Sequence, residues 1–162
     1  MNCKLVSVIS TLAGAVAGAS IGAGVATKKT MKNEKKMKEY SDKHLSMFLL
    51  MNQWVKIKQD GKNLSEYFEK NGYMRIAIYG MSYIGETLVN ELHNSKIKVV
   101  YGIDKKFDTL YCGVDIVSIE DEFESVDAIV VTAISYFDEI EEQLAEKINC
   151  PILSLEDIIY EV

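Results

Sequence analysis

The residues with the clearest chemical potential form a short turn bounded by Gly80 and Gly85. Both match the dinucleotide-binding fingerprint, in which the first glycine makes a tight turn and the last lets helix and strand pack closely. Serine replaces the middle glycine, so its Cβ obstructs a diphosphate or its hydroxyl hydrogen-bonds a single phosphate. Alternatively, the glycines serve only the strand–helix turn. The residues predicted to contact a ligand here are Gly80, Met81, Ser82, Tyr83, Ile84 and Gly85.

An acid and three polar residues are expected to face the same ligand. Asp104 stands 19 residues after Gly85, at the end of the next expected strand, where a carboxylate can accept hydrogen bonds from a ribose. Thr132, Ser135 and Tyr136 follow a later strand, and ligands of open α/β sheets bind at the carboxyl ends of strands. In the structural alternatives, Asp104 is a solvated strand end and the other three are turn and capping residues.

The remaining residues predict neither a catalytic set nor a metal site. The acidic residues between positions 139 and 146 have no histidine beside them and are typical of a solvated helix face. Three widely separated cysteines favour a reducing compartment over a disulfide framework. For nicotinamide chemistry, Tyr83 and Tyr136 are the only proton donors that can be placed near the ligand.

Strands and helices are expected to alternate around these residues. Between positions 107 and 125 the pattern is weak, with at most a short strand at 114–117 and a turn of helix at 120–124. The alternation predicts an α/β fold, with a Rossmann-like parallel sheet of four to five strands and helices on both faces. The expected strands cover residues 75–80, 96–106, 127–134 and 151–159, the last as a strand or strand-turn, and the expected helices cover 81–95 and 136–148.

Residues 5–26 contain no charge and, as a helix, are long enough to span a hydrocarbon core of roughly 30 Å. Glycine, serine and alanine dominate the segment, so insertion is favoured only modestly. We interpret it as a transmembrane helix; a cleaved export signal and a buried or peripheral glycine-rich helix are the alternatives. Gly14, Gly18 and Gly22 share one helix face, a spacing that predicts a homo-oligomer through close helix pairing.

Charge is divided unevenly along the chain. Six lysines between positions 28 and 38 predict a single-pass topology with the C-terminal domain in the cytoplasm, and they favour contact with membrane lipid. Residues 1–60 carry a net charge of +6 and residues 61–162 a net charge of −12. The acidic second part argues against nucleic acid as a partner, because polyanion binding requires a basic face.

Residues 30–59 lack glycine and proline and predict one long helix. A heptad seam is flanked by further apolar residues, which favours docking on the protein's own domain or on a second copy. Asp60 and Gly61 should end this helix, and a short helix should end before Gly72. The expected domains are thus residues 1–27, 28–60 and 61–162. The seam comprises Met37, Tyr40, His44, Met47, Met51, Trp54 and Lys58.

The chain from Trp54 onward resembles small Rossmann-like proteins and appended domains of bacterial surface (capsular) polysaccharide loci. The resemblance is carried by KNLSEYFEKNGYMRIAIYGMSYIGETLVNEL, VVYGIDKK, VDAIVVTAISYFDEIEEQL and CPILSLEDIIYEV. More distantly, it is similar to the nucleotide-sugar-binding N-terminal domain of sugar O- and N-acyltransferases. That resemblance implies a nucleotide-sugar held by Gly80, Ser82, Gly85 and Asp104. The catalytic β-helix of those enzymes is missing, which puts enzymatic activity in doubt.

Together these features predict a membrane-anchored module that binds a nucleotide or nucleotide-sugar and acts as an accessory or sensor in cell-envelope polysaccharide synthesis. The polysaccharide context comes from the resemblance alone. One alternative is a small NAD(P)-dependent oxidoreductase, and another is a non-catalytic membrane adaptor whose Rossmann-like domain is vestigial.

Overall fold

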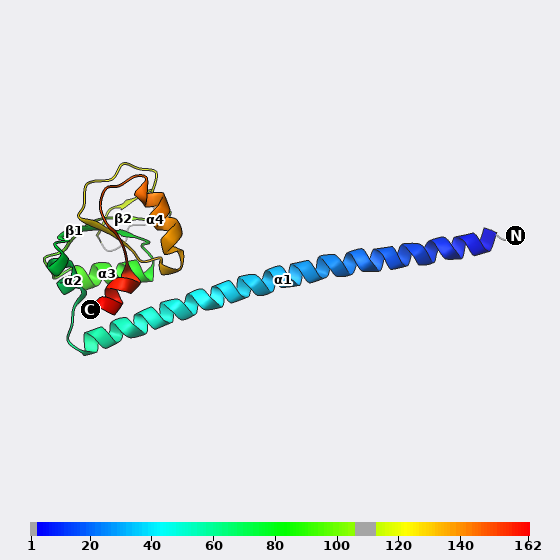
Figure 1. Cartoon of the computed structure of the whole chain (residues 1–162), viewed down its shortest axis with the longest axis horizontal. Coiled ribbons are helices and arrows are strands. Elements are labelled where there is room, and N and C mark those ends of the chain that lie inside the picture. Colours follow the sequence, from blue (N-terminus) through cyan, green and yellow to red (C-terminus); the bar gives the residue numbers. More distant parts are fainter. Residues whose placement is uncertain (1–2, 106–112) are drawn as a thin grey trace. The chain divides into compact units, whose positions relative to one another are not determined.

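The computed structural model describes the backbone of residues 3–105 and 113–162, and the side chains of residues 30–105 and 113–162. The chain divides into two compact units, Met1–Leu45 and Ser46–Val162. One helix, α1 (Cys3–Gln59), supplies residues to both units (Figure 1). The helix predicted for residues 30–59 is confirmed, and it ends where Gly61 adopts a left-handed conformation with φ 76°.

The predicted membrane segment at residues 5–26 and its three spaced glycines lie outside the residues whose side chains are described. Among the residues that the structure describes, no helix is both long and apolar enough to cross a bilayer. Within the first unit, the side chains of Met31, Met37, Tyr40 and Leu45 are exposed.

The Ser46–Val162 unit is built on a five-stranded parallel sheet with the strand order β3-β2-β1-β4-β5. Apart from Arg75, Lys98 and Ser154, the strand residues are apolar, aromatic or glycine, as expected for parallel strands covered on both faces. β1 lies at the centre and pairs with both β2 and β4. The strands are β1 (Arg75–Tyr79), β2 (Lys98–Ile103), β3 (Ile116–Val117), β4 (Ala128–Val131) and β5 (Ile152–Ser154).

Helices cover the two faces of the sheet unequally (Figure 1). Ile76 and Ile78 pack against the larger group: the end of α1, α2 (Leu64–Asn71), α3 (Tyr83–Leu92) and α5 (Leu155–Glu161). Ala77 and Tyr79 point to the opposite face, which α4 (Phe137–Ala145) covers. The alternation follows from the two-residue period of a strand. The predicted α/β class, with a parallel sheet and helices on both faces, is confirmed.

Two local predictions were wrong. The turn of helix expected at 120–124 is absent; instead, Ser118 donates its backbone N–H to the Asp121 carboxylate over 2.8 Å. The segment expected to be a strand or strand-turn at 151–159 is a strand only to Ser154, after which α5 begins. The helix forms because Leu155, Ile158 and Ile159 follow helical spacing, and all three are buried.

The compact unit begins earlier than the domain boundary expected at residue 61. Leu50, Trp54 and Ile57 of α1 are almost completely buried in the same core cluster as residues of α2, α3 and α5. The domain therefore covers only part of the seam predicted along this helix. Trp54 is buried in the domain, whereas Met37 and Tyr40 are exposed. The C-terminal end of α1 is thus part of the folded domain.

Candidate functional site

The carboxyl ends of β1 and β4 are neighbours at the position where the strand order reverses. The chain leaves β1 for β2 on one side, and the later strand β4 pairs on the other. In open α/β sheets, ligands bind outside the carboxyl ends of the strands at such a switch point. Gly80 directly follows β1 and Thr132 directly follows β4, so the structure brings both predicted groups of site residues to one edge.

The two glycines of the turn are required by its packing. Gly80 has φ 95°, and a Cβ at this position would lie 2.7 Å from the Thr132 hydroxyl oxygen. A Cβ at Gly85 would lie only 2.3 Å from the carbonyl oxygen of Gly80. Real Cβ contacts are longer than either distance, so a larger residue requires the turn to move. The fold therefore explains both glycines even without a ligand.

Asp104 lies at the same edge but also has a structural role. Its carboxylate accepts a hydrogen bond from the backbone N–H of Met81 over 2.9 Å. This hydrogen bond thus links the glycine turn to the end of β2. This contact does not fit the alternative in which Asp104 is only a solvated strand end, and its contact with a ribose stays a prediction.

Three other predicted site residues point away from solvent. Thr132 is only 3% exposed and donates its hydroxyl to the Gly80 carbonyl oxygen over 2.5 Å. Met81 and Ile84 are also buried, in the core cluster beneath the turn. These three side chains therefore support the turn and do not present polar atoms to a ligand.

Four predicted residues remain accessible: Ser82, Tyr83, Ser135 and Tyr136. Ser82 is the N-cap residue of α3 and has an extended backbone, and its side chain makes no capping hydrogen bond. Tyr83, the first residue of the helix, is 83% exposed. Because the first N–H groups of a helix have no partners within it, this end of α3 offers donors and a positive dipole end to an anion.

The neighbouring helix α4 brings negative charge near its own N-terminus. Its first turn contains Asp138 and Glu139. Further along, an acidic surface hollow of about 300 Å³ is lined by Glu139, Glu142, Gln143 and Glu146. Among the described residues, no group of three histidine, cysteine or acidic side chains is placed to hold a metal ion.

In the described part of the chain, every clear pKa shift raises the pKa of a tyrosine or cysteine further above 7. Burial, and to a smaller extent the Asp104 carboxylate, raises the pKa of Tyr79 beside the glycine turn. Burial is also the main cause that raises the pKa of Tyr101 to about 12 and the pKa of the Cys150 thiol. A general acid or base works best near the ambient pH, so these shifts tune none of these groups for proton transfer.

A family model described as C2185-like, N-terminal, matches residues 72–152, which is half of the 162-residue chain. The chain belongs to the C2185-like N-terminal family. The matched segment contains the glycine turn, Asp104 and the residues that follow β4. No curated protein and no solved structure matches the chain.

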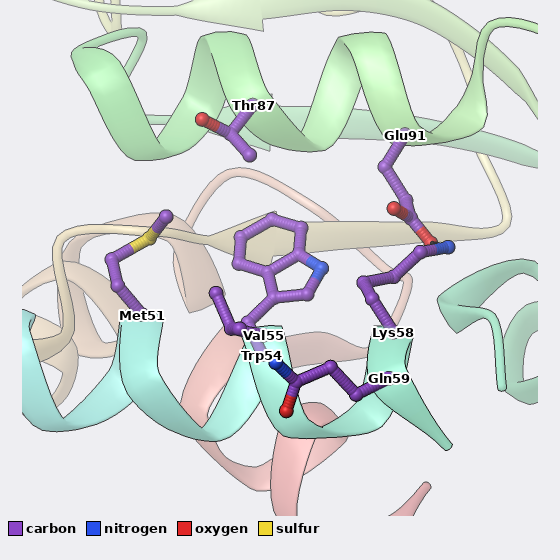
Figure 2. Close-up of a pocket in the computed structure, with 7 residues that line it drawn as sticks. All are labelled: Met51, Trp54, Val55, Lys58, Gln59, Thr87 and Glu91. Atoms are coloured by element: carbon purple, nitrogen blue, oxygen red, sulfur yellow. Dashed lines mark hydrogen bonds and ion pairs between the residues drawn. The ribbon is translucent and has the colours of Figure 1, made fainter. Parts of the chain in front are cut away.

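A second hollow lies only partly within the C2185-like segment. It is an apolar groove of about 330 Å³ between the end of α1 and helix α3, with the Trp54 indole between the two helices (Figure 2). Residues 51–59 lie before the family match, whereas Thr87 and Glu91 lie within it. The residues lining the groove are Met51, Trp54, Val55, Lys58, Gln59, Thr87 and Glu91.

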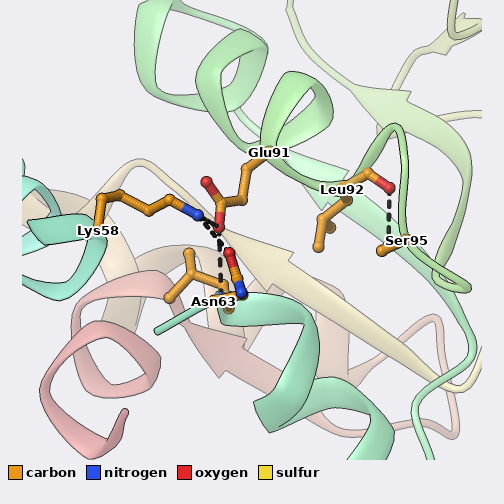
Figure 3. A network of polar contacts seen from close by, with 6 residues as sticks. Lys58, Asn63, Glu91, Leu92 and Ser95 are labelled. Carbon is orange, nitrogen blue, oxygen red and sulfur yellow. Dashed lines mark hydrogen bonds and ion pairs between the residues drawn. The ribbon is translucent and has the colours of Figure 1, made fainter. Parts of the chain in front are cut away.

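A polar junction involves Lys58 and Glu91, which also line this groove (Figure 2 and Figure 3). The Lys58 ammonium group donates to the Glu91 carboxylate over 2.8 Å and to the Asn63 side-chain oxygen over 2.5 Å. The same Glu91 oxygen also accepts the backbone N–H of Leu64 at 3.4 Å. Sequence reasoning missed the groove, because its two walls are about 30 positions apart; the single tryptophan was the only available signal.

Proposed function

We propose that the C2185-like segment binds a nucleotide or nucleotide-sugar, with a phosphate at the first turn of α3. The observation that carries this proposal is the glycine turn at the sheet's switch point, which opens directly onto α3 with Ser82 exposed at the N-cap. The module acts without catalytic residues, as an accessory or sensor in cell-envelope polysaccharide synthesis. This biological context rests on the resemblance of residues 54–162.

The start of α3 offers hydrogen-bond donors to a phosphate of the ligand. Gly80 and Gly85 hold the end of β1 close to the start of α3, so a ligand at the turn meets the first N–H groups of that helix. The Ser82 hydroxyl, which makes no capping bond, adds one more donor. Tyr83 and Tyr136 follow the ends of β1 and β4, and their exposed rings can pack on a base or a sugar.

Ser82→Asp is expected to weaken binding of the tightest ligand found in the screen about tenfold or more. A carboxylate that faces a phosphate at close range repels it by roughly 1.4 kcal/mol, which corresponds to a tenfold change in the dissociation constant. Aspartate is a good N-cap residue, so the fold should persist. Binding is measured by calorimetry on the full-length chain, after a thermal-shift screen with UDP-sugars, NAD, NADP, CoA and simple nucleotides.

Asn63→Asp is the matched control, because it places the same charge at the N-cap of α2, away from the glycine turn, and should leave the affinity unchanged. Asp104→Asn keeps an oxygen for the Met81 N–H and tests the ribose contact, with an expected loss of about 1–3 kcal/mol in binding. If no ligand shifts the melting temperature, the proposal fails and the adaptor is favoured. Turnover of a bound nicotinamide would instead indicate the oxidoreductase.

We also propose that residues 5–26 anchor the protein as a single-pass membrane helix, with the lysines at positions 28–38 on the cytoplasmic side near anionic lipid. The support is the 22-residue uncharged run and its lysine-rich flank. Gly14, Gly18 and Gly22 let two such helices approach closely.

The anchored protein is expected to resist carbonate extraction, and protease added to intact spheroplasts should leave residues 46–162 uncut. Replacement of the three glycines by leucine should preserve membrane association, since leucine partitions better into lipid, while it weakens helix pairing. A mature protein that begins near Thr27 would show that the segment is a cleaved export signal.

A further inference from the structure

The end of α1 has an apolar face that its own domain leaves uncovered. Leu50, Trp54 and Ile57 face the core, whereas the side chains of Phe48 and Val55 are 66% and 50% exposed. Met51 lies between these two along the helix and is half-buried. A spacing of three and then four residues places Phe48, Met51 and Val55 on one stripe, which we call the α1 stripe.

The α1 stripe borders the groove between α1 and α3. Met51 and Val55 belong to both, and Figure 2 shows Met51, Val55 and Trp54 reaching from α1 toward Thr87 of α3. The same face of the molecule therefore carries an apolar ridge and an apolar hollow next to it. A two-fold interface brings the same patch of both copies together, so that patch must complement itself.

We propose that the α1 stripe and the adjoining groove form the contact with a second copy of this chain, in which two α1 helices pack side by side in parallel. Upstream of the stripe, the three- and four-residue steps continue through His44, Ser41 and Met37. This alternation is the spacing of a coiled-coil seam. It shares Met51 with the seam expected from the sequence but has Phe48 and Val55 in place of Met47 and Trp54. The structure packs Met47 and Trp54 against the domain core, and Met51 also contacts that core.

Charge on this face suits an identical partner. Neither the stripe nor the positions that flank it between residues 44 and 57 carry a charged side chain: the flanking residues are Leu45, Met47, Asn52 and Trp54. Lys58 at the end of the groove is paired with Glu91. Between residues 44 and 57, two copies can therefore approach without bringing like charges together, whereas an acidic or basic partner would gain no ion pairs there.

Coverage of α1 favours the parallel arrangement over the antiparallel one. An antiparallel pair centred on Met51 would place residue 43 beside Gln59, where α1 ends, so earlier residues would have no partner helix. The exposed Met31, Met37 and Tyr40 all precede that position. A parallel pair places each of them beside its own copy. A helix that is exposed over many turns is also marginal without such packing.

Disulfide cross-linking of the full-length protein tests this contact directly. With Cys3, Cys112 and Cys150 replaced by serine, Phe48→Cys and Val55→Cys should each cross-link to their own copies at least about tenfold faster than Leu49→Cys. Leu49 is an exposed apolar neighbour that lies about 100° around the helix from Phe48, which makes it a matched control. Equal rates for Leu49→Cys would overturn the contact. If Phe48→Cys cross-linked only to Val55→Cys, and neither variant cross-linked to its own copies, the parallel direction would be overturned.

The mass of the protein provides the second measurement. In detergent, light scattering should give a protein mass of twice 18.2 kDa. Phe48→Glu with Val55→Glu should raise the dissociation constant about 100-fold by burying like charges across the two-fold axis, while circular dichroism stays unchanged. Leu49→Glu should leave the dimer intact. A monomeric wild-type protein, or a doubly substituted variant with unchanged mass, would refute the proposal.

Discussion

Gly85→Ala is expected to lower the free energy of unfolding by about 3 kcal/mol, the upper end of the cost of overpacking a well-packed site. The added Cβ would lie 2.3 Å from the Gly80 carbonyl oxygen, and that oxygen is part of the backbone. It cannot move easily, because it accepts the Thr132 hydroxyl while the Gly80 N–H donates to the Ile103 carbonyl. Urea unfolding followed by circular dichroism measures the loss.

Gly61→Ala is the control for this substitution. Gly61 has a positive φ, unlike Gly85, but no atom lies within 4 Å of the position that its Cβ would occupy. Its replacement should cost only about 1 kcal/mol, from backbone strain alone. A loss at Gly85 no larger than the loss at Gly61 would mean that the turn adapts, and that the close approach of α3 to β1 is not essential. Substitution of Gly80 or Gly85 therefore changes the stability of the fold before it reports on a ligand. For this reason Ser82 is the better probe of binding.

Trp54→Ala should destabilise the protein by about 3–5 kcal/mol, as expected when a large buried aromatic side chain is removed and leaves a cavity. Trp54 is 3% exposed and packs in the same cluster as Phe68 of α2 and Leu88 of α3. Together with Leu50 and Ile57, it joins the end of α1 to the domain. The thermal or urea midpoint of the full-length chain is the measurement.

Val55→Ala, one residue further along, removes an exposed side chain and should change the unfolding free energy of the monomer by less than about 0.5 kcal/mol. If Trp54→Ala were equally mild, the Ser46–Gln59 part of α1 would not belong to the folded unit. A fragment that begins at residue 60 lacks Leu50, Trp54 and Ile57 and would expose the surface that they cover. Binding experiments therefore require the full chain.

The glycine turn illustrates how a binding site and a folding element share residues. Asp104 and Thr132 sit where a ligand-binding acid and hydroxyl were expected, yet both hydrogen-bond to the backbone of the turn. Substitutions that remove these hydrogen bonds change the shape of the turn as well as any contact with a ligand. Ser82, in contrast, is exposed and makes no capping bond, so its substitution isolates the anion-binding proposal from the stability of the fold.

Local patterns in the sequence were sufficient to predict most of the elements. Three strands are short, mainly apolar runs bounded by polar or glycine residues: β1, β2 and β4. The ends of α1 and α2 follow from Gly61 and Gly72, both with positive φ. These signals act through hydrogen bonds and backbone preferences within a few residues, so they can be recognised without knowledge of distant contacts.

Only the tertiary structure decided what the individual site residues do. The Thr132 hydroxyl meets Gly80 across 52 positions, and Trp54 meets the groove wall at Thr87 from a different helix. Position in sequence indicated that Asp104 would reach the sheet edge, but not that Met81 would donate to it. Similarly, helical spacing marked α1 as amphipathic without showing which side of it the domain would cover. These outcomes depend on how strands and helices pack over long separations, and the local spacing of residues does not contain that information.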